Sequence, residues 1–167
     1  PPFVGLNPHR VVADATAVYG DEKRVKTAVL RFPQFAGYVH ARVVADATAV
    51  YGDEERIKEI LLKRPRFASY DHVRVVADAT AVYGNGEWVK RTILKHSRFV
   101  GFDHERVVSD CALVYGVGTD RVKDAILRHP QFAYLDHVRV VADVTAVYGD
   151  EDKIKKNYFK TSTICWL

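Results

Sequence analysis

Several features that mark other protein classes are missing from this sequence. Only two cysteines occur among its 167 residues, and Cys111 and Cys165 stand in unrelated contexts that support neither a disulfide framework nor a zinc site. No apolar run approaches the roughly 18 residues needed to cross a bilayer, and the first residues lack the basic and apolar regions of a signal peptide. No segment alternates polar and apolar residues as a strand does. We therefore expect an all-α, reduced, intracellular protein with no membrane segment.

Signatures of catalysis are missing as well. No serine has a nucleophile-elbow context, and no glycine-rich phosphate loop is present. A column of histidines recurs, but repeats that stack about 10 Å apart are too distant to share metal bonds of roughly 2 Å. We interpret these histidines as packing or capping residues, and we predict no enzyme, no metal and no cofactor. The column consists of His40, His72, His104 and His137.

What the sequence contains is a tandem repeat. The segment RVVADATAVYG begins at Arg10, Arg42 and Arg74, and edited copies begin at Arg106 and Arg139, so the starts lie 32, 32, 32 and 33 residues apart. A fixed period of this length is typical of a solenoid, in which each unit packs on its neighbours. The hydrophobic share of 48% is enough to bury a continuous core. We predict a right-handed superhelical solenoid of two-helix repeats.

The predicted solenoid forms one domain over residues 1–167. The letters FVGL at residues 3–6 match FVGF at residues 99–102, so we expect the chain to begin inside a repeat. The repeats cover 10–41, 42–73, 74–105 and 106–138, with the end of a preceding repeat at 1–9, a partial repeat at 139–160 and a tail at 161–167.

The first helix of each repeat is predicted from its apolar spacing. Val11, Ala15, Val18 and Tyr19 fall at i, i+4, i+7 and i+8, which is one buried helical stripe. Gly20 then ends the helix, because glycine takes the left-handed conformation at little cost. The candidate N-caps of the first helices are Asn7, Asp71, Asp103 and Asp136.

The second helix follows directly. Asp21 is its predicted cap in the first repeat, and Thr119 takes that place in the fourth, after one inserted residue. Pro33, which lacks a donor and restricts the residue before it, is expected to end the helix, as Pro65 and Pro130 do in other copies. A short linker follows, and we expect its phenylalanine and its tyrosine or leucine positions to fill the gap between repeats.

Three columns on the second helix carry basic residues. Two of them are seven residues apart, nearly two turns, and share one face, while the middle lysine column is rotated away from it. Rows of cations of this kind neutralise a phosphate backbone, although lysine and arginine on an exposed helix are also ordinary solvated residues. The predicted phosphate-contacting residues are Arg24, Arg56, Arg121 and Lys153, with Trp88 in the same column; Lys26, Lys58, Lys90, Lys123 and Lys155; and Arg31, Lys63, Lys95, Arg128 and Lys160.

Residues that flank the proline position differ from copy to copy. Phe32 stands before it in the first repeat, where other copies carry arginine or histidine. Such side chains can hydrogen-bond to bases or stack on them. The same variation is also typical of surface residues that have no binding function. The candidate base-contacting residues are Gln34, Arg64, Arg66, His96, Arg98, His129 and Gln131.

A second charge pattern is internal to the first helix. Arg10 and Asp14 are i, i+4 neighbours, and the same pair recurs in every copy. We expect these residues to neutralise each other, so the aspartates are structural rather than catalytic.

Two families of helical-repeat nucleic-acid binders resemble this chain. VVADATAVYGDEERIKEILLKRPRF resembles the transcription activator-like effector repeat, with its short helix, glycine turn and longer proline-interrupted helix. YGVGTDRVKDAILRHPQFAYLD and VLRFPQFAGY resemble repeats of mitochondrial transcription termination factors. The place of the first family's base-reading pair holds a constant Ala-Val or Leu-Val here, so that family's code does not carry over. The resemblances imply a superhelical nucleic-acid binder of the nucleus or mitochondrion.

The expected function is therefore nucleic-acid binding, with DNA as the first expectation and RNA as the second. The mildly basic balance, a net charge of +4, permits an anionic partner without requiring one. The alternative is a protein-interaction solenoid without nucleic-acid binding, and the third possibility is an inert spacer or a fragment of a secreted effector. We expect a monomer in each case.

Overall fold

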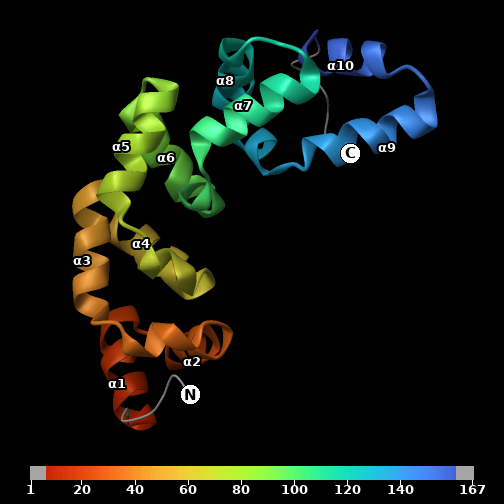
Figure 1. Ribbon diagram of the computed structural model, residues 1–167. Helices are drawn as coiled ribbons and strands as arrows, with labels where there is room; N and C mark the ends of the chain where they lie inside the picture. Colours follow the sequence, from red (N-terminus) through yellow and green to blue (C-terminus); the bar gives the residue numbers. More distant parts are fainter. Residues whose placement is uncertain (1–6, 161–167) are drawn as a thin grey trace. The chain divides into compact units, whose positions relative to one another are not determined.

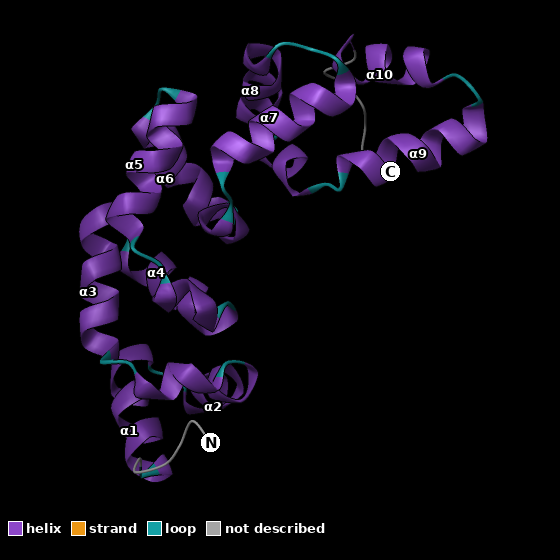
Figure 2. Ribbon diagram, viewed as in Figure 1, coloured by secondary structure: helices purple, strands orange, loops and turns teal. Residues whose placement is uncertain are grey.

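The computed structural model describes residues 7–160, with side chains up to Asn157, and this part of the chain consists of helices joined by short loops, without a strand (Figures 1 and 2). The predicted all-α repeat is confirmed. The tail at 161–167 and residues 1–6 lie outside the described residues. The first helices are α1 (Pro8–Tyr19), α3 (His40–Tyr51), α5 (His72–Tyr83), α7 (His104–Tyr115) and α9 (His137–Tyr148). The second helices are α2 (Glu22–Arg31), α4 (Glu54–Lys63), α6 (Gly86–Lys95), α8 (Thr119–Arg128) and α10 (Glu151–Lys160).

A third element, a short 3-10 helix, follows each of the first four second helices. These elements are η1 (Pro33–Gly37), η2 (Pro65–Ser69), η3 (Ser97–Gly101) and η4 (Pro130–Tyr134). The segment that the sequence predicts as a linker is thus regular structure.

The repeats group into two compact units, and the division falls inside α5. Unit 1 comprises the described residues up to 77 together with 86–101, and unit 2 comprises 78–85 and the described residues from 102 onward. In unit 1, α1 and α3 lie on one side and α2 and α4 on the other (Figure 1). The second helices of unit 1 stack in order, because α2 contacts α4 and α4 contacts α6. In unit 2, α7 contacts both α8 and α9.

The predicted caps delimit the helices. Asn7 accepts hydrogen bonds from the first turn of α1, and Asp21 accepts one from Arg24 N at 2.9 Å at the start of α2. Gly52 ends α3 with φ of 82°, in the left-handed region that glycine adopts freely. The prediction that Thr119 caps α8 is wrong: the inserted residue moves Gly118 into the extended cap position, without a side-chain bond, and Thr119 becomes the first helical residue.

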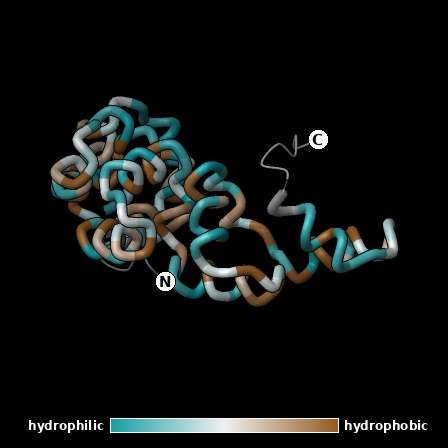
Figure 3. Tube along the Cα trace, turned by 90° about the horizontal axis from the view of Figure 1, so that it is seen from above, coloured by the Kyte–Doolittle hydropathy of each residue, from teal (hydrophilic) through white to brown (hydrophobic). Residues whose placement is uncertain are grey.

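Apolar side chains meet between the first helix, the second helix and the 3-10 helix. Figure 3 shows apolar and polar residues alternating along the helical turns, as expected for helices with one buried face. The 3-10 helices bring their phenylalanines into this core, where Phe35 and Phe99 are fully buried. Burying such a side chain contributes roughly 1.5–3 kcal/mol. The expectation that the linker phenylalanines fill the gap between repeats is confirmed.

Neighbouring 3-10 helices also match each other's side chains. In unit 2, the ring of Tyr134 stacks on Phe102, with centroids 5.2 Å apart. In unit 1 the same place is taken by Gly101, where an added Cβ would lie 2.7 Å from the hydroxyl oxygen of Tyr70. At this position, a large residue, Tyr134, packs against Phe102, whereas a small residue, Gly101, leaves room for the larger Tyr70.

Consecutive repeats are joined by a buried tyrosine–histidine hydrogen bond. The hydroxyl of Tyr115, at the end of α7, lies 2.9 Å from Nδ1 of His137, at the start of α9. Nε2 of His137 lies 2.8 Å from the carbonyl oxygen of Phe132, so this nitrogen carries the proton and the tyrosine donates to Nδ1. The equivalent pairs, at 3.1–3.3 Å, are Tyr19 with His40, Tyr51 with His72 and Tyr83 with His104.

Candidate nucleic-acid interface

The second helices end in one repeated backbone geometry. The C-cap residues Phe32, Arg64 and His129 have φ, ψ of −143°, 86°; −138°, 77°; and −134°, 82°. Each donates its N–H to the helix and then accepts a bond from the phenylalanine three residues later, as in Phe35 N to Phe32 O at 2.8 Å. A proline follows the cap in these three repeats, which restricts the backbone at this point. The backbone on either side of the proline position therefore has the same geometry whichever residues stand there.

Basic residues gather at these helix ends in unit 1. We call this group the helix-end cluster: Arg31, Lys63, Arg64, Arg66, Lys95 and Arg98, all exposed. The three second helices pack against one another in order, α2 on α4 and α4 on α6, and α2 also contacts η2, the 3-10 helix of the next repeat. The guanidinium of Arg66 lies over the ring of Phe32, 6.0 Å from its centroid, and so links two consecutive repeats.

Most of the helix-end cluster has no acidic partner. Lys63 pairs with Glu59, one turn earlier, at 2.7 Å. Among the residues that the structure describes, the other members of the cluster form no ion pair. Their charges remain available to an anionic ligand.

The middle lysine column differs in this respect. Four of its five lysines pair with a glutamate in the first turn of the same helix, and Lys58 has two such partners, whose hydrogen bonds raise the pKa of its ammonium group. Lys123 is half-buried. The pairs are Lys26 with Glu22 at 2.5 Å, Lys58 with Glu54 at 2.7 Å, Lys90 with Glu87 at 3.1 Å and Lys155 with Glu151 at 2.6 Å.

In the column nearest the start of the second helix, some residues form ion pairs or pack in the core and others are exposed without an ion pair. Arg56 pairs with Glu59 and donates from Nε to the carbonyl oxygen of Leu94 at 3.0 Å, so it joins α4 to α6. Trp88 is half-buried, and its ring meets Phe99 edge-on at 5.7 Å. Lys153 pairs with Asp150 at 3.2 Å. The exposed members without an ion pair in the described chain are Arg24 and Arg121.

Acidic and basic groups thus separate along each second helix. The first turns carry Glu22 in α2, Glu54 and Glu55 in α4, and Asp120 in α8, whereas the last turns are basic. The helix dipole favours this arrangement, with anions at the start and cations at the end. In unit 2 the exposed residues at the end of α8 are Arg128, His129 and Gln131. The side chain of Lys160 lies outside the described residues.

The predicted structural residues lie away from the helix-end cluster. The histidine column is at most 8% exposed, and its rings lie in the repeat junctions. Within the described residues, no group of histidine, cysteine and acidic side chains could hold a metal ion, and no helix is long and apolar enough to span a membrane. The expected pairs on the first helices form at exposed positions, as Arg42 with Asp46 at 3.6 Å and Arg106 with Asp110 at 3.5 Å show.

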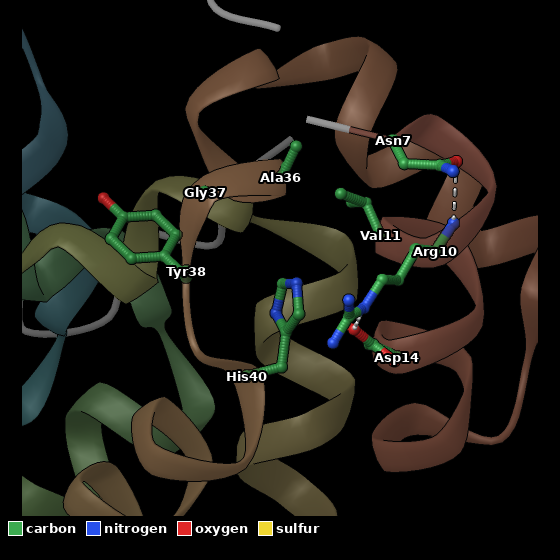
Figure 4. A pocket seen from close by; sticks show the side chains of 8 residues that line it. All are labelled: Asn7, Arg10, Val11, Asp14, Ala36, Gly37, Tyr38 and His40. Atoms are coloured by element: carbon green, nitrogen blue, oxygen red, sulfur yellow. Dashed lines mark hydrogen bonds and ion pairs between the residues drawn. The ribbon is translucent and has the colours of Figure 1, made fainter. Parts of the chain in front are cut away.

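An open pocket of about 390 Å³ lies in unit 1 between α1, η1 and the start of α3 (Figure 4). Its charged groups satisfy one another, because Arg10 pairs with Asp14 at 3.7 Å. His40 also lines this pocket, and its Nδ1 is bonded to Tyr19. The sequence points to Arg10, Asp14 and His40 as structural residues but not to a pocket between them.

Comparison with known proteins adds no relative: the chain matches no family profile, no curated protein and no solved structure.

The basic columns are evident in the sequence, whereas the difference between them was not predicted. In the sequence, Lys26 and Arg31 are both basic residues of the same helix. Only the structure shows that Lys26 forms an ion pair and that Arg31 does not, within the part of the chain that it describes. A usable signal is present, since Glu22 stands four residues before Lys26 and no acidic residue precedes Arg31 at three or four positions.

Proposed function

We propose that this repeat array binds DNA and that Arg31, Lys63, Arg64 and Lys95 of the helix-end cluster in unit 1 contact the phosphate backbone. The observation that carries the proposal is the separation of charge: exposed cations, all but Lys63 without a carboxylate partner in the described chain, occupy the ends of α2, α4 and α6, and these helices pack against one another in order. Cations on successive helices replace counterions condensed on a polyanion, and the release of these counterions favours binding. The resemblance to transcription activator-like effector repeats favours DNA over RNA.

The middle lysine column contributes less in this proposal. A lysine that already pairs with a glutamate, as Lys26 does at 2.5 Å, must leave that partner before it meets a phosphate. Exposed pairs of this kind are worth only a few tenths of a kcal/mol, so the lysines remain accessible, but each brings a carboxylate close to the ligand. The net attraction therefore comes chiefly from the helix ends.

The test measures binding of the full chain to a labelled random-sequence duplex by fluorescence anisotropy between 50 and 300 mM salt. Replacing Arg31, Lys63, Arg64 and Lys95 together with glutamine is expected to weaken binding to all sequences. The slope of log K against log salt should become shallower by about 0.9 for each phosphate that the variant no longer neutralises.

A matched variant removes the same number of charges from the paired column by replacing Lys26, Lys58, Lys90 and Lys155 with glutamine. It should retain most of the affinity and most of the salt slope. Equal weakening in both variants would show that the helix ends are not the DNA-binding surface, and undetectable binding at 50 mM salt would remove the proposal altogether.

A protein-interaction array is the second candidate, and one observation favours it. Apolar side chains stand exposed on first helices, with Val73 at 68% exposure, Leu113 at 81% and Val138 at 67%. Scattered exposed residues of this kind are common, but first-helix positions recur in every repeat, so each unit offers a partner protein apolar side chains at repeated positions. Absence of nucleic-acid binding at low salt would favour this candidate.

A further inference from the structure

The helix ends present variable side chains from a constant backbone. Gln34, Arg66, Arg98 and Gln131 are the second residues of the four 3-10 helices, and all are exposed. The hydrogen bond that starts each 3-10 helix is the same in all four copies, from the phenylalanine N–H to the C-cap carbonyl oxygen at 2.8–2.9 Å. Repeats therefore differ at this position in the side chain, while the backbone that carries it is the same.

The kind of variation at these positions is restricted. The second 3-10 position holds only glutamine or arginine, and the C-cap position holds only phenylalanine, arginine or histidine. By contrast, the middle of the second helix changes sign freely, with Thr27, Glu59, Arg91 and Asp124 in one column. The helix dipole by itself disfavours acidic residues at the helix ends, and contact with an anionic polymer would add to that restriction.

The two residue types found at the second 3-10 position match two bases. Glutamine forms a bidentate pair with N6 and N7 of adenine, and arginine with O6 and N7 of guanine, both on the major-groove edge of duplex DNA. Neither match requires a change in the protein backbone, because only the side chain differs between repeats.

The preceding repeat helps to hold one of these arginines. The guanidinium of Arg66 lies 6.0 Å from the centroid of the Phe32 ring, which belongs to the C-cap of α2. A guanidinium over an aromatic face is attracted by the ring, and this attraction restricts where the arginine head group lies. Phe32 is thus a positioning residue for Arg66.

We infer, on the basis of the proposed function, that the second residue of each 3-10 helix selects a base in duplex DNA. Gln34 and Gln131 select adenine, and Arg66 and Arg98 select guanine. Within unit 1 the order Gln34, Arg66, Arg98 corresponds to adenine, guanine and guanine along the bound strand.

The test selects duplexes from a randomised library with the full-length protein and with two exchange variants, Arg66→Gln and Gln34→Arg. We expect Arg66→Gln to change one preferred guanine to adenine and Gln34→Arg to change one preferred adenine to guanine, with the other preferences retained. Anisotropy with the matched duplexes should show about a tenfold change in relative affinity at the exchanged position, since one bidentate contact discriminates by roughly 1–3 kcal/mol.

Arg91→Gln is the matched control, because it removes the same charge from an exposed position in the middle of α6. It should leave every base preference unchanged. Phe32→Ala should weaken the guanine preference assigned to Arg66 without altering the adenine preference assigned to Gln34, and Phe32→Tyr should restore it. Circular dichroism of each variant checks that the helices remain.

The ways in which this inference can fail are distinguishable. Salt-sensitive binding without any base preference would overturn this inference and leave the proposed function standing, whereas absence of binding would overturn both. If Arg66→Gln weakened all duplexes equally, Arg66 would be a phosphate contact and the inference would be wrong. Base preferences that exchange only in a single-stranded RNA library would overturn the assignment to duplex DNA.

Discussion

At the scale of single residues, the tyrosine–histidine pair explains why the repeat keeps two polar rings in an apolar junction. Burial lowers the pKa of His137, because a charged imidazole loses its water, and the hydrogen bond to Phe132 and the nearby carboxylate of Asp136 oppose this only in part. A neutral imidazole has one donor and one acceptor, and both are used, by the carbonyl oxygen of Phe132 and the hydroxyl of Tyr115. Burial of the ring and the tyrosine bond to Nδ1 recur in all four junctions, so the histidine column is a structural feature of each of them.

Tyr115→Phe tests this junction bond. The substitution leaves Nδ1 of His137 buried without a donor, so we expect the free energy of unfolding to fall by about 1–3 kcal/mol. Urea denaturation followed by circular dichroism measures the decrease. Tyr148→Phe is the control: Tyr148 occupies the same column but is 75% exposed, and its replacement should change stability by no more than a few tenths of a kcal/mol. Equal effects in both variants would contradict the role of the bond.

At the scale of elements, the end of the second helix is the point where sequence and structure differ most. The proline column correctly predicts where α2, α4 and α8 end. The 3-10 helices were not predicted, because five residues with i, i+3 bonds are too short to show a periodicity. The third repeat has serine in place of proline, and yet His96 and Phe99 make the same 2.8 Å bond. The core packing of Phe99 and its neighbours therefore holds this geometry without the proline.

Ser97→Pro should stabilise the third repeat. Proline at a compatible backbone position restricts the unfolded chain, which raises the free energy of unfolding by roughly 0.4–1 kcal/mol. The reciprocal change, Pro33→Ser in the first repeat, should lower it by a similar amount. Thermal and urea denaturation of both variants measure these shifts, and a destabilised Ser97→Pro protein would show that the two backbones are not equivalent.

At the scale of the whole molecule, histidines buried in successive junctions couple stability to pH. Burial lowers the pKa of His40 and His137, and that of His72 to about 4. In the unfolded chain a histidine titrates near 6.5, so below this pH the unfolded state binds protons that the folded state does not. Stability is therefore greatest above about pH 6.5 and falls as the pH drops toward the folded pKa.

We expect the free energy of unfolding to fall between pH 7.5 and pH 5 by about 1.4 kcal/mol per pH unit for each buried histidine that titrates fully. Urea denaturation across this range measures the slope. His72→Phe removes one titrating group, so it should start from a lower stability but decline less on acidification. His9→Gln removes an exposed histidine and should keep the full slope. An unchanged slope in His72→Phe would contradict the mechanism.

Local rules along the chain are enough to specify the repeat, its helices and its caps. The i, i+4 spacing of Ala15 and Tyr19, the left-handed conformation of Gly20 and the cap formed by Asp21 all act within a few residues, so they can be predicted from the sequence. The basic columns and the phenylalanine that fills the junction were also predictable, because they recur with the period.

Which repeated residues meet depends on the packing of one repeat against the next. Tyr51 and His72 lie 21 residues apart in sequence, and their hydrogen bond forms only because the two repeats stack. Likewise, Lys26 and Arg31 differ in availability because of where their neighbours lie, and Arg66 reaches Phe32 only because consecutive repeats pack together. In a periodic sequence, every column of residues recurs in the same way, so the sequence alone does not rank the columns. Packing gives each column different neighbours. Those neighbours place one column in the core and leave another exposed for the proposed DNA contact.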